Sequence, residues 1–118
     1  MADEKLEELR ALLERAAKRL AGVTQRKMFG CNAFFADKTI FGLIWKTGRI
    51  GLKLPEQDSY DAVMGLDGAQ PWTAGKRTMS HWVLVPPAFH DDAATLQHWA
   101  KIAHRLARRA ARGNTKER

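Results

Sequence analysis

The segment that decides the fold spans residues 26–54 and reads RKMFGCNAFFADKTIFGLIWKTGRIGLKL. Apolar residues dominate it, and the polar pairs Asp37-Lys38 and Thr47-Gly48 interrupt it. Two-residue connections of this kind close tight β-hairpins, because they reverse the chain between paired strands. The segment therefore predicts three antiparallel strands, which cover residues 27–36, 39–46 and 49–54.

The three strands differ in how many apolar faces they have. The third alternates, with Ile50 and Leu52 on one face and Arg49 and Lys53 on the other, so it has one face toward water. The first two strands are apolar on both faces. Such strands must be covered twice. We therefore expect a second layer of helix or a partner subunit, and hence a homodimer.

The flanking residues predict an α+β fold. Leu6, Leu9 and Leu13 recur at helical spacing, and Asp91 or Asp92 can cap a last helix. The predicted elements are a helix over residues 3–21, a short helix over 57–64, a loop over 66–77, a strand over 78–85 and an amphipathic helix that begins after Asp91 or Asp92 and runs to about 112. Together they give about four to five antiparallel strands in a single domain over residues 1–118, with a core over about 6–112 and a frayed tail over 113–118.

Composition excludes several classes of protein. Hydrophobic residues make up 45% of the 118 residues, which is enough for a core and excludes wholesale disorder. The longest apolar run, over residues 40–45, is too short to cross a membrane. The single cysteine, Cys31, excludes an internal disulfide and a cysteine-based zinc site. The acidic start of the chain is unlike a signal peptide, so we expect a cytoplasmic protein with no membrane partner.

Positive charge is concentrated in two places. The chain has 20 Lys and Arg residues against 13 Asp and Glu, a net charge of +7. Residues 21–60 have six basic side chains against three acidic, and residues 91–118 have seven against three. On the last helix the basic side chains lie opposite the apolar seam, and they are Lys101, Arg105, Arg108, Arg109 and Arg112.

This basic stripe has two readings. Arginine and lysine in a row along a helix can bind a nucleic-acid backbone or another acidic partner. A solvated outer face is the alternative, since any surface helix has charges opposite its apolar seam. A second cationic set surrounds the sheet. Phe34 or Trp45 nearby could provide a platform on which bases stack, and the alternative is that these aromatic residues belong to the core. Its members are Arg26, Lys27, Lys46, Arg49 and Lys53.

Several motifs, in order and at characteristic spacing, resemble the TfoX/Sxy N-terminal domain family. They are RKMFGC at residues 26–31, GRIGLKL at 48–54, SHWVLVP at 80–86, and Asp91-Asp92 followed by Leu96 and Trp99. The resemblance covers roughly residues 6–107. It implies an α+β domain and relatives that regulate natural competence as co-activators with the cyclic-AMP receptor protein. Those regulators have a second, C-terminal helical domain without a counterpart here, so we expect a stand-alone N-terminal domain.

The motif Met28-Phe29-Gly30 is the sharpest point of this resemblance, and its residues suit a structural role. Two apolar side chains would enter the sheet, and the glycine would permit a bulge or a close approach. Cys31 alternates with apolar neighbours, which indicates a buried and inert thiol.

The sequence has no Ser/His/Asp set, Gly-rich phosphate loop or paired histidines at helical spacing. We therefore expect no catalytic residues, no metal and no cofactor. The function predicted is a non-enzymatic interaction module in transcription regulation, with a protein partner. One alternative is a nucleic-acid-binding protein that uses the basic last helix. The other is a small enzyme or ligand-binding domain.

Overall fold

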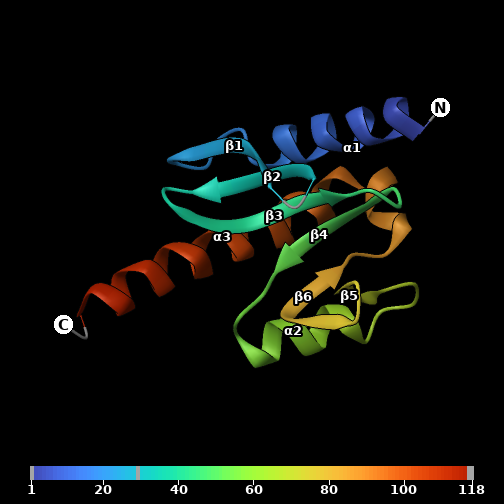
Figure 1. Cartoon of the computed structure of the whole chain (residues 1–118). Helices are drawn as coiled ribbons and strands as arrows, with labels where there is room; N and C mark the ends of the chain where they lie inside the picture. Colours follow the sequence, from blue (N-terminus) through green and yellow to red (C-terminus); the bar gives the residue numbers. More distant parts are fainter. Residues whose placement is uncertain (1, 29, 117–118) are drawn as a thin grey trace.

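A computed structural model of the chain describes residues 2–28 and 30–116, and it has an α+β fold (Figure 1). Six antiparallel strands form one sheet in the order β1-β2-β3-β4-β6-β5. The elements are α1 (Ala2–Ala16), β1 (Val23–Met28), β2 (Cys31–Ala36), β3 (Thr39–Trp45), β4 (Arg49–Lys53), α2 (Gln57–Met64), β5 (Gln70–Ala74), β6 (Arg77–Leu84), the 3-10 helix η1 (Pro87–Asp91) and α3 (Ala93–Lys116). The sequence predicted the fold class correctly, with four to five strands instead of six.

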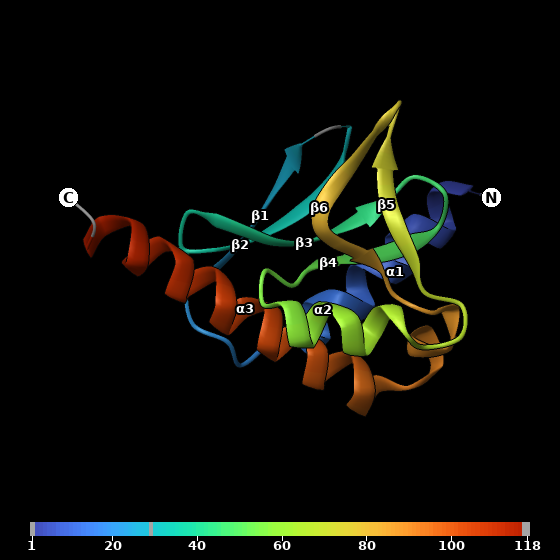
Figure 2. The same ribbon diagram turned by 90° about the horizontal axis from the view of Figure 1, so that it is seen from below.

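The main core lies between the sheet and two helices. Both α1 and α3 lie on the same side of the sheet (Figure 2). Leu9 and Leu13 of α1 and Leu96 of α3 are buried against Phe41 and Leu52 of the sheet. The apolar stripes at helical spacing therefore pack in the core, as their periodicity indicates. Among residues 2–28 and 30–116, the helices are each too short or too polar to cross a membrane.

The first predicted strand, over residues 27–36, is wrong in its boundaries. Residues 31–36 form β2, and residues 23–28 form a separate strand, β1, that pairs with it so that Met28 faces Cys31. Gly30 has a φ of +74°, a left-handed conformation that glycine adopts without the Cβ clash. Gly30 therefore lies in a chain reversal between two strands and not in a bulge. Phe29 lies outside the described residues.

The predicted loop over residues 66–77 contains a strand. β5 pairs with β6, and its Trp72 is fully buried. The Trp72 ring makes edge-to-face contacts with Trp45 at 5.1 Å and with Trp82 at 5.0 Å between centroids. These aromatic side chains belong to a second buried cluster, which also contains Cys31, Ala33, Phe35, Leu43 and Leu84.

This second cluster changes how the apolar strands are covered. The β5–β6 hairpin extends away from the helices on the other side of the sheet (Figure 2). Trp72 and Trp82 pack there on residues of β2 and β3, so one chain buries both sheet faces. The expected second layer of helix or partner subunit is therefore wrong for this face. The homodimer stays a prediction, without this argument in its favour.

Two helix ends differ from their predictions. α1 ends at Ala16 and not at residue 21, because the chain must reverse before β1 begins at Val23. α3 begins at Ala93 as predicted, with the Asp92 carboxylate accepting a hydrogen bond from the Thr95 backbone N–H at 3.1 Å. It runs to Lys116, past the predicted end near residue 112. One glycine in a helix costs about 1 kcal/mol, too little to stop a segment rich in Ala and Arg.

Candidate interaction surface

The predicted basic residues of α3 lie along its surface. Lys101, Arg105 and Arg109 are exposed. Arg108 is half-exposed, and its Nε lies 3.3 Å from Oδ2 of Asp37 in the connection between β2 and β3. Arg112 is on α3, but its side chain lies outside the described residues. The stripe thus presents three exposed cations and a fourth, Arg108, that forms an ion pair with Asp37.

His104 fixes α3 against the segment that follows α1. Its side chain is buried, and its Nε2 donates a hydrogen bond to the carbonyl oxygen of Ala21 at 2.7 Å. Its ring also packs edge-to-face on Phe41, with 5.5 Å between centroids. Because these contacts join α3 to both the sheet and the turn after α1, the relative position of the two helices is determined here.

Three adjoining hollows follow the seam between α1 and α3, and we call them together the α1–α3 groove. The largest, about 460 Å³, is lined by Ala16, Arg19, Leu20, Ala94, Gln97, His98 and Lys101. A second, about 240 Å³, is lined by Leu20, Lys101, His104, Arg105 and Arg108. A third, about 160 Å³, is lined by Leu12, Arg15, Ala16, Ala93, Leu96 and Gln97. Adjacent hollows share lining residues, so the groove is continuous.

The groove combines an apolar floor with basic sides. Leu12, Ala16 and Leu20 form the floor on the α1 side. Five cations line the groove: Arg15 of α1, Arg19 in the turn after α1, and Lys101, Arg105 and Arg108 of α3. Among the described residues that line the three hollows, none is acidic. Low polarity beneath the cations strengthens their attraction for an anion.

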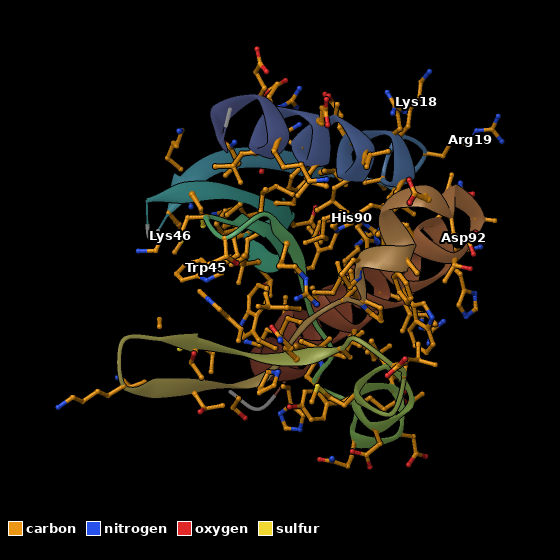
Figure 3. The ribbon with its side chains drawn as sticks, turned by 90° about the vertical axis from the view of Figure 1, so that its right-hand side faces the viewer. Lys18, Arg19, Trp45, Lys46, His90 and Asp92 are labelled. Atoms are coloured by element: carbon orange, nitrogen blue, oxygen red, sulfur yellow. The ribbon has the colours of Figure 1, made fainter. Side chains whose placement is uncertain are left out.

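Sequence reasoning missed the half of this surface that α1 provides. The first 20 residues have no net charge, which hides their separation along the helix. Glu4, Glu7 and Glu8 are at the beginning of α1, whereas Arg15 is in its last turn and Lys18 and Arg19 are in the turn that follows (the last two labelled in Figure 3). The sequence shows this basic end, but it does not show that the end lies beside α3.

The second cationic set does not form a stacking site for bases. Phe34 is fully buried, and Trp45 is 9% exposed with Lys46 Nζ above its ring at 5.2 Å (Figure 3). Arg49 has a structural role, because its Nη2 donates hydrogen bonds to the carbonyl oxygens of Gly68 at 2.7 Å and Val85 at 2.9 Å. Burial also lowers the pKa of Arg49. The aromatic residues are core, as the alternative reading held.

Cys31 is buried, as predicted. Its Sγ donates a hydrogen bond to the carbonyl oxygen of Met28 at 3.1 Å, and burial raises the pKa of the thiol. Since the thiolate is the reactive form, this environment disfavours nucleophilic chemistry. Within the described parts of the chain, no group of three or more His, Cys, Asp and Glu side chains could hold a metal ion.

Comparison with known proteins identifies the family. No curated protein matches the chain significantly. The family model described as the TfoX N-terminal domain matches residues 14–107, which is most of the 118-residue chain. The match includes the end of α1, the whole sheet and α3 as far as Ala107, and with them nearly all of the α1–α3 groove. The chain therefore belongs to the TfoX N-terminal domain family.

Proposed function

We propose that the protein is a non-enzymatic regulatory module that binds an acidic protein partner through the α1–α3 groove. The observation that carries the proposal is the groove itself, with an apolar floor and five cations in its lining. A partner that offers both apolar and acidic side chains satisfies both parts of this surface. Membership of the TfoX N-terminal domain family supports a role in transcription regulation of the competence type, in the cytoplasm.

Energetics favour a protein partner over a nucleic-acid backbone at this place. Burying apolar surface stabilises a complex by about 25 cal/mol per Å². A nucleic-acid backbone of phosphates and sugars would bury little apolar surface on Leu12, Ala16 and Leu20. Apolar side chains of a protein partner would bury much more, and so they would gain more of this stabilisation. Interfaces between proteins typically have such an apolar centre inside a polar rim.

Nucleic-acid binding remains a second candidate function because Lys101, Arg105 and Arg109 are exposed in a row along α3. If these cations and Arg108 neutralise about four phosphates, the log–log slope of affinity against salt is about −3.6. A flat salt response, or a lack of retention on duplex DNA at low salt, contradicts this candidate.

Affinity capture from native cytosol, with and without nuclease, tests the proposed function. The variant Lys101→Glu/Arg105→Glu reverses two charges in the groove. The control Lys76→Glu/Arg77→Glu reverses two exposed charges where β5 turns into β6. We expect a captured protein that resists nuclease, disappears with the groove variant and remains with the control. Capture that requires nucleic acid, or equal loss with both variants, overturns the proposal.

A further inference from the structure

The two sides of the α1–α3 groove have the periodicity of helix surfaces. On the α1 side, Leu12, Ala16 and Leu20 follow one another at a spacing of four residues. On the α3 side, the lining positions also recur at three or four residues, and they are Ala94, Gln97, Lys101, Arg105 and Arg108. The α3 side is therefore one ridge of side chains on one helix, and the α1 side is a ridge of two floor residues of α1, Leu12 and Ala16, that Leu20 extends in the turn after the helix. The space between two such ridges is the shape into which a ridge of a third helix packs.

Hydrogen bonding also favours a helical occupant over an extended one. An extended peptide gains affinity by adding to the open edge of a sheet, where backbone groups lack partners. Most of the α3 side is helix interior, and the α1 side consists of the last turns of α1 and the turn that follows it, so neither presents the row of free backbone groups that a sheet edge has. A helix satisfies its own backbone groups, so it can lie in this groove without leaving any of them unsatisfied.

Length and charge define the occupant further. From Ala94 to Arg108 the α3 wall spans 14 residue steps, or about 21 Å at 1.5 Å per residue. A partner helix of about four turns matches this length. Because cations flank the apolar floor on both sides, its apolar stripe should have acidic side chains on both flanks. The small side chains of Ala16 and Ala94 allow a close approach.

A second copy of the chain is a poor occupant. The apolar stripe of α1 is buried in its own core through Leu9 and Leu13, and that of α3 through Leu96 and Leu106. The remaining α-helix in the described part of the chain, α2, has eight residues, which is about two turns. The occupant therefore comes from another protein.

Resting on the proposed function, we infer that the α1–α3 groove binds an acidic amphipathic helix of about four turns from a partner protein. Leucines of that helix lie on Leu12, Ala16 and Leu20. Its carboxylates face Arg15 and Arg19 on one side and Lys101 and Arg105 on the other. In the complex, the partner helix packs on α1 and α3.

The test uses a designed probe, a fluorescent 16-residue peptide with leucines at positions 1, 4, 8, 11 and 15 and mainly Glu at the others. A scrambled peptide of the same composition has no apolar stripe. Anisotropy titrations at physiological salt compare both peptides on the full chain. We expect the striped peptide to bind about tenfold more tightly than the scrambled one, because only its leucines can lie together on the floor.

Two kinds of variant separate the contribution of shape to peptide affinity from that of charge. Ala94→Trp fills the largest hollow from an exposed position, and Gln97→Trp does so from another exposed position if the first variant folds poorly. Either should weaken the striped peptide about tenfold and leave the scrambled one unchanged. Lys101→Glu/Arg105→Glu should weaken both peptides, whereas Lys76→Glu/Arg77→Glu should weaken neither by more than about twofold.

The outcomes distinguish this inference from the proposed function. Equal affinity of the two peptides, with no effect of tryptophan in the groove, overturns the helical occupant. If charge reversal then still abolishes capture from cytosol, the proposed function stands without it. Displacement of the striped peptide by duplex DNA at equal concentration assigns the surface to nucleic acid and overturns both. Loss of binding with the control variant as well also overturns both.

Discussion

His104 and Ala21 are joined by a hydrogen bond of 2.7 Å, from the imidazole Nε2 to the backbone carbonyl oxygen, although they are 83 residues apart. Since a carbonyl oxygen can only accept, Nε2 must carry the proton, and this bond determines how the ring is oriented. The bond connects the middle of α3 to the turn after α1, at the floor of the groove. The His104 side chain therefore contributes both to the stability of the fold and to the lining of the groove.

His104→Ala should lower the free energy of unfolding by about 2 kcal/mol, because it removes this hydrogen bond and the edge-to-face contact with Phe41. Urea denaturation measures the change. His98→Ala is the matched control, since His98 is exposed on the same helix. Similar stability of the two variants would contradict a structural role for His104.

Asp37→Asn should strengthen binding of an acidic peptide about threefold at low salt. The change removes the carboxylate that lies 3.3 Å from Arg108, so the full charge of that guanidinium becomes available to the partner. Asn tolerates the left-handed backbone of residue 37, where φ is +57°, about as well as Asp.

Anisotropy titrations compare Asp37→Asn with Asp67→Asn, which removes an exposed carboxylate from the loop after α2. The control changes net charge by the same amount away from the groove. An equal gain with both variants would show that net charge alone is responsible and that the pair with Arg108 has no part in it.

Trp72→Ala should lower the free energy of unfolding by about 4 kcal/mol, because a fully buried indole leaves a large cavity. It also uncovers apolar side chains of β2 and β3, so the variant should associate at concentrations where the wild type does not. Urea denaturation and light scattering measure the two effects. A variant as stable as the wild type would show that β5 does not cover this face.

Stability should fall as pH decreases from about 7 to 5, through His90. Burial lowers the pKa of His90, and the nearby charges of Lys5 and Arg49 lower it further, against a smaller opposing effect of Asp91. Its Nε2 is also buried without a hydrogen-bond partner among the described residues. The unfolded chain therefore takes up the proton at higher pH than the folded one. The stability that neutral His90 contributes is complete above about pH 6.5, and it is lost as the pH falls below that value.

His90→Gln removes the titrating group, so the slope of unfolding free energy against pH should become smaller in that window. The effect of one proton is at most about 1.4 kcal/mol per pH unit. Urea denaturation at half-unit pH steps measures it. Identical slopes in wild type and variant would show that His90 does not sense pH.

Local patterns explain most of the fold that the sequence predicted. The two short polar connections place β2, β3 and β4 in order, alternation supports β4, and α2 has its predicted bounds. β1 and β5 were missed because edge strands need few apolar residues. Four of the six residues of β1 are exposed, and β5 contains Pro71, which only an edge strand tolerates. The burial of Trp72 depends on β2 and β3, which local sequence cannot show.

The site was half predicted for a similar reason. Lys101, Arg105 and Arg108 lie on one helix, so a helical projection finds them. The groove depends on Arg15 and Arg19 as well, and these two residues are more than 80 residues away from that stripe in the sequence. Only the fold, through contacts such as that of His104 with Ala21, brings the two ends together.

The placement of the four tryptophans gives the protein two separate optical reporters. The Trp72 ring lies edge-to-face with the rings of Trp45 and Trp82, at about 5 Å from each, close enough for excitonic coupling in circular dichroism. Trp99 lies apart on α3, with its ring 5.1 Å from that of His98 in the groove lining. Loss of the coupled signal will report opening of the sheet, and a change in Trp99 emission alone will report occupancy of the groove. Folding and binding can thus be followed in one unlabelled sample.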